Sequence, residues 1–140
     1  MDPARSASVL INLDVPDLAR AEAFYTQVFE LRAGRRFGPH ALELIGGAAP
    51  LYLLENPAGS RPLPDVAVQR DYARHWTPVH LDFVVTDLDR VLSRALQAGA
   101  KAEGAIRNQP FGRIAQLADP FGHGLCLIEW SSAGYDAIAT

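Results

Sequence analysis

An internal repeat, at an offset of 70 residues, is the feature that most constrains the fold of this chain. The segment "LINLDVPDLA" at residues 10–19 resembles "HLDFVVTDLD" at residues 80–89, and "LYLLE" at residues 51–55 resembles "LCLIE" at residues 125–129. The identical pairs of the first match are Val9/Val79, Val15/Val85, Asp17/Asp87, Leu18/Leu88 and Arg20/Arg90. Self-similarity of this kind is the signature of a duplicated structural unit. We therefore expect two modules, at about residues 9–55 and 79–130.

Each module begins with a strand that leads into a helix. Apolar and polar residues alternate over residues 11–15 and again over residues 81–85, which is the period of a half-buried strand. Asp17 and Asp87 follow, at positions where a carboxylate can accept hydrogen bonds from the free amides of a helix's first turn. Apolar residues then recur at helical spacing in both modules. The sequence thus predicts one helix per module, packed on the apolar face of its strand.

Glycine and proline divide the rest of each module. Gly34 and Gly99 are placed to end the two helices. Further turn signals lie at Gly38-Pro39, Gly46-Gly47, residues 108–110 and residues 119–122. They leave three short strands after each helix, so each module is predicted as βαβββ and the chain as an α+β fold. If every strand turns its polar face away from its helix, the two sheets can curl around a shared cleft.

The whole chain is expected to form a single domain. A length of 140 residues suits one compact domain with a real core. Residues 56–78 are rich in proline and charge and lack periodicity, which indicates a linker or a flap across the mouth of the cleft. Each module leaves an edge strand exposed, and exposed edges favour pairing with another chain. We expect a homodimer.

Composition narrows the classes of partner. The formal net charge is −3 and the basic residues are scattered, so nucleic acid is not an expected partner. No apolar run reaches the length of a membrane helix, and the N-terminal "MDPARSAS" lacks the apolar stretch of a signal peptide. A cytoplasmic location without membrane contact is therefore expected. Cys126 is the only cysteine, which excludes an intramolecular disulfide and a zinc site built from several cysteines.

The tandem βαβββ pattern resembles the vicinal oxygen chelate superfamily. The motifs that carry the resemblance are "VPDLARAEAFYTQVFEL", "HLDFVVTDLD" and "DPFGHGLCLIE", and it covers about residues 8–130. The superfamily includes glyoxalase I, extradiol dioxygenases, methylmalonyl-CoA epimerase, fosfomycin resistance proteins and bleomycin-binding resistance proteins. Because this fold hosts unrelated chemistries, the resemblance implies the fold and leaves the activity open.

The resemblance also implies where a metal would bind. In metal-dependent members, ligands come from the first and last strand of each module. These positions fall here on Leu10, Tyr52 (or Leu53), His80 and Cys126. Leu10 has no ligand atom, whereas His80 fits the pattern, and Cys126 stands where Glu is usual and would shift preference toward zinc. We expect no metal; if one binds, its ligands are His80, Cys126 and Tyr52.

His80 is the candidate catalytic residue, because histidine titrates near neutrality and can orient a ligand or transfer a proton. The alternative is a histidine simply hydrogen-bonded to a neighbour such as Asp82. Glu55 and Glu129 fall on the opposite strand faces by the same alternation and are not treated as catalytic. The expected ligand-binding residues are Asn12, Asp14, Tyr52, Asp82, Cys126 and Trp130.

Two functions agree with these features. The first is a small-molecule-binding protein that resembles the bleomycin-resistance type and has a degenerate metal site. The alternative is a glyoxalase-like enzyme, metal-dependent or metal-free, acting on a small organic substrate as a lyase, isomerase or epimerase, thiol transferase or dioxygenase. The first is favoured, because the positions of the superfamily's metal ligands offer one convincing ligand, His80.

Overall fold

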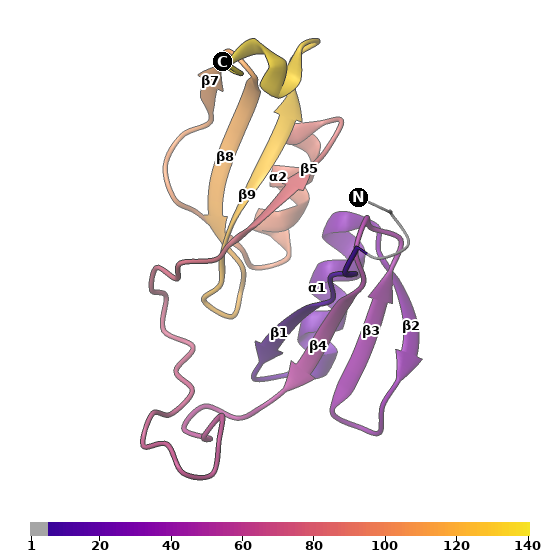
Figure 1. The fold of residues 1–140 in the computed structure, drawn as a ribbon, viewed down its shortest axis with the longest axis vertical. Coiled ribbons are helices and arrows are strands. Elements are labelled where there is room, and N and C mark those ends of the chain that lie inside the picture. Colours follow the sequence, from indigo (N-terminus) through magenta and orange to yellow (C-terminus); the bar gives the residue numbers. More distant parts are fainter. Residues whose placement is uncertain (1–5) are drawn as a thin grey trace. The chain divides into compact units, whose positions relative to one another are not determined.

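The computed structural model describes residues 6–140, which fall into two compact units that divide after Asp71 (Figure 1). Each unit contains one helix and one mixed sheet, in the order expected for a βαβββ module. The α+β fold with two modules is confirmed. The two units are described separately below.

In the first unit, a four-stranded sheet packs on one helix. The elements are β1 (Ile11–Val15), α1 (Leu18–Phe29), β2 (Arg32–Arg36), β3 (Ala41–Ile45) and β4 (Leu51–Glu55). The strand order is β1-β4-β3-β2, with β1 parallel to β4 and the other pairs antiparallel. The helix contacts β4, β3 and β2 (Figure 1). Its apolar stripe forms the core with alternate residues of the strands. The central buried residues are Val15, Phe24, Tyr25, Val28, Leu42, Leu44 and Leu53.

The second unit repeats this plan with one change. Its elements are β5 (Leu81–Val84), α2 (Leu88–Gln97), β6 (Lys101–Ala102), β7 (Arg107–Gln109), β8 (Gly112–Ala118) and β9 (Gly124–Trp130), followed by a 3-10 turn at Gly134–Ala137. Strand β5 is parallel to β9, β9 pairs with β8, and both β6 and β7 pair with β8. One edge of the sheet is therefore made by two short pieces, where the sequence predicted a single strand.

The same pair of contacts fixes the start of both helices. Asp17 accepts a hydrogen bond from the Arg20 amide, and Asp87 accepts one from the Arg90 amide, each at 3.1 Å. The last strand of each module adds a second carboxylate. Glu55 accepts from the Leu18 amide at 2.7 Å, and Glu129 accepts from the Leu88 amide at 2.8 Å. These bonds satisfy free amides of each first turn and place a negative charge at the positive end of the helix dipole. The predicted N-caps are confirmed. Glu55 and Glu129 act as additional caps at the starts of the two helices.

Two of the predicted element boundaries are wrong. Helix α1 ends at Phe29, and Glu30 takes the left-handed conformation (φ 56°) expected of Gly34. Gly34 instead lies in β2, where an added Cβ would stand 2.6 Å from Glu43 Oε1, so a larger residue would have to displace this carboxylate. Residues 108–109 belong to β7, and the turn lies at Pro110 and Phe111. Gly99, by contrast, follows α2 with φ 107°, as predicted.

The segment predicted as a linker or flap is held in two places. Its first part folds back on itself, since the Arg70 amide donates to the Ser60 carbonyl at 2.7 Å and the Gly59 amide donates to the Arg70 carbonyl at 2.8 Å. Residues 72–76, here called the strap, lie against the second unit. Arg74 in the strap binds both carboxylate oxygens of Glu103, at 2.8 and 2.9 Å.

Gly122 allows the strap to lie close to the turn between β8 and β9. It has φ +88°, and an added Cβ would stand 2.2 Å from the Tyr72 carbonyl oxygen. Its left-handed conformation and this close contact both require glycine.

Within residues 6–140, no helix combines the length and the apolar character needed to span a membrane.

Candidate functional site

The residues predicted to bind a ligand lie on the sheet faces that point away from the helices. In the second unit, Leu125 and Leu127 of β9 are buried toward α2, so the intervening Cys126 points to the opposite face. The register places Asp82 and Gln116 on either side of Cys126, on the same face. In the first unit, Asn12 pairs with Tyr52 in the equivalent ladder position. The two modules therefore present equivalent positions with different side chains.

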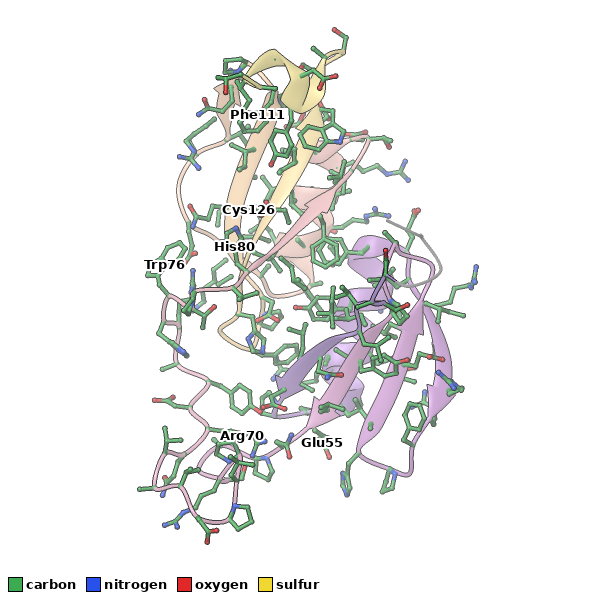
Figure 2. The ribbon with its side chains drawn as sticks, viewed as in Figure 1. Glu55, Arg70, Trp76, His80, Phe111 and Cys126 are labelled. Atoms are coloured by element: carbon green, nitrogen blue, oxygen red, sulfur yellow. The ribbon has the colours of Figure 1, made fainter. Side chains whose placement is uncertain are left out.

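His80, Asp82 and Cys126 come together in the second unit and are called the His80 cluster. One ligand atom from each lies within 4.8 Å of the other two. His80 Nε2 is 3.2 Å from Asp82 Oδ1, and both side chains are accessible to solvent, whereas Cys126 is buried. Figure 2 shows His80 and Cys126 toward the same end of the sheet of the second unit. The predicted association of His80 with Asp82 is thus present.

The Cys126 thiol is held in its neutral form. Burial, and then the neighbouring Asp82 carboxylate, raise the pKa of Cys126 from 9.0 to about 11. A protonated thiol donates to Asp82 and is a poor nucleophile. Asp82 therefore lies close to both of its neighbours, and among residues 6–140 the one polar contact of the His80 ring is this distance of 3.2 Å to Asp82. The other ring nitrogen, Nδ1, has no such contact within the described residues.

Asp14, one of the expected ligand-binding residues, contacts the linker segment. It accepts hydrogen bonds from Asn56 Nδ2 and from Arg70 Nε, both at 2.9 Å. These contacts anchor the first part of the linker segment to the sheet of the first unit. Asn12, the neighbouring predicted residue, is exposed on the same face. Ligand binding by either residue remains a prediction.

Glu43 is a buried carboxylate that sequence reasoning missed, and with Arg35 and Tyr52 it forms what we call the Glu43 cluster. Arg35 Nη2 and Tyr52 Oη both donate to Glu43 Oε2, at 2.6 and 2.8 Å, and Arg35 Nε donates to Oε1 at 3.1 Å. The hydrogen bonds from Arg35 lower the pKa of Glu43 to about 2, and Glu43 in turn raises the pKa of Tyr52. A single carboxylate inside the apolar strand "ALELI" was the signal that pointed to it.

At the positions that the resemblance gives for metal ligands, the described residues of the first unit offer no available donor. Leu10 precedes β1 and has no ligand atom, and Leu53 is fully buried on the helix side of its strand. Tyr52 donates its hydroxyl proton to Glu43, and its raised pKa opposes the phenolate that a metal would need. The remaining donors, in the His80 cluster, all belong to the second unit. The residues present therefore do not fit a centre that takes ligands from both modules, and ligation by Tyr52 with His80 and Cys126 stays a prediction.

An aromatic cluster stands at the other end of the second sheet. The ring centroids of Trp130 and Tyr135 are 4.5 Å apart, those of Phe111 and Tyr135 are 5.3 Å apart, and the rings meet edge to face. Trp130 lies at the end of β9 and remains 39% exposed. Trp76, the second tryptophan, stacks under the Arg74 guanidinium at 4.2 Å and belongs to the strap.

Two arginines of the second unit have distinct surroundings. Arg113 points toward the helix side, where it binds both carboxylate oxygens of Asp89 at 2.8 and 3.0 Å. Arg107 on β7 pairs with Ile114 and lies close enough to favour the Cys126 thiolate electrostatically. Of the two, only Arg107 is placed to influence the His80 cluster.

Comparison with known families assigns the chain to a family. The model of the glyoxalase-like domain family matches residues 10–128, which include both modules. The protein belongs to this family and thereby to the vicinal oxygen chelate superfamily.

Individual relatives and structures agree with the assignment. The chain is 32% identical to an uncharacterized protein of Mycobacterium tuberculosis over 88% of its own length and 72% of the relative's. It is 30% identical to the anthracycline biosynthesis protein DauV of a Streptomyces species, over 92% of its length and 43% of the relative's. The manganese-bound fosfomycin resistance protein FosX of Listeria monocytogenes shares the fold, with a TM-score of 0.68, 18% identity, and coverage of 91% of this chain and 93% of that one. Lactoylglutathione lyase of Agrobacterium tumefaciens has a TM-score of 0.60 at 19% identity, with coverage of 89% and 95%.

Proposed function

We propose that the protein binds a small organic molecule on the sheet faces that point away from the helices, without the metal ion used by many members of its superfamily. In this proposal it resembles the bleomycin-resistance type. The His80 cluster supplies hydrogen-bonding groups, and Asn12, Asp14, Tyr52 and Trp130 contribute to the ligand's surroundings.

The observation that carries the proposal is the hydrogen bond from the Tyr52 hydroxyl to Glu43, which makes this hydroxyl unavailable to a metal. A metal centre built from both modules would need a donor at Leu10 or Tyr52, and the first has none while the second is bound in the Glu43 cluster. The similarity to DauV supports an organic ligand, because that relative is named as an anthracycline biosynthesis protein. Binding is thus better supported than metal catalysis.

A second candidate function is metal-free proton transfer by His80. The contact of 3.2 Å between His80 Nε2 and Asp82 Oδ1 is a distance at which a carboxylate can orient an imidazole for proton transfer. A substrate C–H or O–H group at the other ring nitrogen would then exchange a proton with His80. This function predicts turnover that is lost in His80→Gln while binding is retained.

The experiment that tests the proposal combines metal analysis with ligand screening on the purified, untagged chain. Elemental mass spectrometry follows incubation with Zn, Mn, Fe(II) or Ni and desalting, and a thermal-shift screen then covers small organic compounds. The expected result is far less than one metal per chain and a rise in Tm with some organic compounds. About one metal per chain, lost in both His80→Ala and Cys126→Ser, would refute the metal-free proposal.

We further propose a cytoplasmic homodimer. Exposed Val9 and Val79 precede the edge strands β1 and β5, and apolar residues beside open strand edges favour chain pairing. Sedimentation at micromolar concentration should give the mass of two chains, and a single-chain mass would contradict the dimer. Cell fractionation tests the location.

A further inference from the structure

We infer that the second module binds the carboxylate group of a small organic acid between Arg107 of β7 and Gln116 of β8. This inference rests on the proposed function and adds the chemical class of the ligand. It comes from two polar side chains that are neighbours on the sheet face pointing away from α2, and from an ion pair that removes a competing charge beside them.

Arg107 and Gln116 lie on the same face of the sheet. Leu117 of β8 is fully buried, and α2 contacts β8, so the preceding Gln116 points to the face away from the helix. Ile114, two residues from Gln116, shares that face and is the ladder partner of Arg107. Arg107 and Gln116 are therefore diagonal neighbours on adjacent strands, a spacing that long side chains can bridge.

The two side chains are open and have no partner in the described part of the chain. Arg107 is exposed and Gln116 is half-buried. Neither the Arg107 guanidinium nor the Gln116 carboxamide makes a hydrogen bond or an ion pair among residues 6–140. Arg113, by contrast, points to the helix side and is bound by both carboxylate oxygens of Asp89. A guanidinium and an amide NH2 group are thus left side by side, and both donate hydrogen bonds to anions.

The carboxylate beside them is already paired. Glu103 follows β6 and lies opposite Gln116, because its amide donates to the Gln116 carbonyl at 2.8 Å. Arg74 of the strap binds both carboxylate oxygens of Glu103, at 2.8 and 2.9 Å. This pair is neutral, so it leaves the charge of Arg107 for a ligand. That charge also acts on the middle of the sheet: burial raises the pKa of the Cys126 thiol, and Arg107 acts in the opposite direction.

A bulge in the edge of the sheet separates the two charged residues. Glu103 stands opposite Gln116, and Arg107 stands opposite Ile114, so three residues of the edge face a single residue of β8. Gly104, the first of the three, has φ +108°. Bulges re-aim side chains and are common next to active sites. Here the bulge lengthens the edge between the carboxylate of Glu103 and the guanidinium of Arg107.

Charge and the number of donors favour a carboxylate over a phosphate group. Arg107 is a single cation and balances a single negative charge. A phosphate dianion would leave one charge unbalanced in a row of side chains that also contains Asp82 and Glu103. The guanidinium offers two parallel N–H groups to the two oxygens of a carboxylate, and the Gln116 amide adds a third donor. Ile114, half-buried beside them, offers an apolar contact to the carbon skeleton of the acid.

Benzoate is the probe for this site, and benzamide is its neutral counterpart of similar shape. The full chain is labelled with 15N and titrated in the presence of EDTA, and NMR follows the Arg107 Nε–H and Gln116 side-chain NH2 signals. These signals are assigned by their loss in Arg107→Gln and Gln116→Glu. The expected result is a saturable shift of both signals with benzoate and no shift with benzamide. Phenylphosphonate, at a pH where it is largely a dianion, should bind more weakly than benzoate.

Variants of the two residues test the geometry. Arg107→Gln should weaken benzoate binding by roughly tenfold or more, as expected for the loss of a hydrogen bond to a charged group. Arg107→Lys keeps the charge and loses the planar fork, so its effect should be smaller. Gln116→Glu replaces a donor by a like charge and should abolish binding. Arg90→Gln removes an exposed arginine of α2, on the other side of the sheet, and as the matched control should leave the affinity unchanged.

Circular dichroism and Tm establish that each variant is folded, and several results would overturn the inference. An equal loss in Arg107→Gln and Arg90→Gln would, because binding would then follow the net charge of the chain. The absence of a shift with benzoate, equal binding of benzamide, or tighter binding of phenylphosphonate would each do the same. If neutral organic compounds raise Tm while benzoate does not bind, the inference fails and the proposed small-molecule function stands. If no organic compound binds and a metal binds stoichiometrically, the proposed function itself fails.

Discussion

Cys126 should react with iodoacetamide about a hundredfold more slowly than an ordinary thiol at moderately alkaline pH. The reactive species is the thiolate. Burial and Asp82 raise the pKa of Cys126 from 9.0 to about 11, and a shift of this size lowers the thiolate fraction roughly a hundredfold wherever the pH is well below both values. The restricted access of a side chain in a residue that is only 7% exposed slows the reaction further.

The assay is the rate of alkylation of the folded chain as a function of pH, followed by mass spectrometry. Since Cys126 is the single cysteine, the rate reports one site. Asp82→Asn removes the charge that ranks after burial among the causes of the raised pKa. The profile of this variant should move to lower pH and still lie above that of an ordinary thiol, because burial remains. Asp65→Asn, in an exposed loop of the first unit, is the matched control and should leave the profile unchanged.

Denatured protein should show the ordinary thiol profile, which confirms that the protection comes from the fold. A native profile with its midpoint near 9 would refute the burial of the thiol. An Asp82→Asn profile identical to that of the wild type would refute the contact between Asp82 and Cys126, and with it the present geometry of the His80 cluster.

Two further predictions test other parts of the structure. Gly104→Ala should cost about 1–2 kcal/mol of unfolding free energy in urea, because Gly104 has φ +108° and no atom lies within 4 Å of an added Cβ. Gly122→Ala should cost clearly more, because its Cβ would also meet the Tyr72 carbonyl, and equal losses in the two variants would contradict the docking of the strap. The pKa of Glu43 is lowered from 4.5 to about 2, so this group contributes stability that is present above 4.5 and is lost as the pH falls toward 2. Unfolding free energy should therefore fall more steeply with acidification in the wild type than in Glu43→Gln, and parallel curves would contradict the Glu43 cluster.

The repeat was sufficient to predict the fold because its signals are local. Alternation over residues 11–15 and 81–85 defines strands, and Asp17 and Asp87 begin helices through bonds that span three residues. The alternation also predicted that Glu55 and Glu129 would lie on the other strand faces. Their bonds to the helix amides join residues far apart in the sequence, so no local pattern could predict them.

Where the prediction failed, the determining contact was distant in the sequence. Gly34 has the residue type of a helix end, yet its position is set by the Glu43 side chain on a neighbouring strand. Local patterns also gave no sign of the bond from Arg70 to Asp14, because it joins residues 56 positions apart in the sequence. Glu43 was overlooked because its burial becomes acceptable only through Arg35 and Tyr52, which come from two other strands.

The ladder positions of the two modules explain why the His80 cluster occurs only once. Asn12 pairs with Tyr52 in the first unit, and Asp82 pairs with Cys126 in the equivalent position of the second. The helix caps are the same in both units, because each helix must satisfy its first amides in the same way. The open faces have no such requirement, so their side chains are free to differ. In the first unit this face carries the Glu43 cluster, in which the Tyr52 hydroxyl is hydrogen-bonded to Glu43. In the second it leaves His80 with one ring nitrogen toward Asp82 and the other without a protein partner among residues 6–140. Among the described residues, the grouped imidazole, carboxylate and thiol are therefore found in the second module.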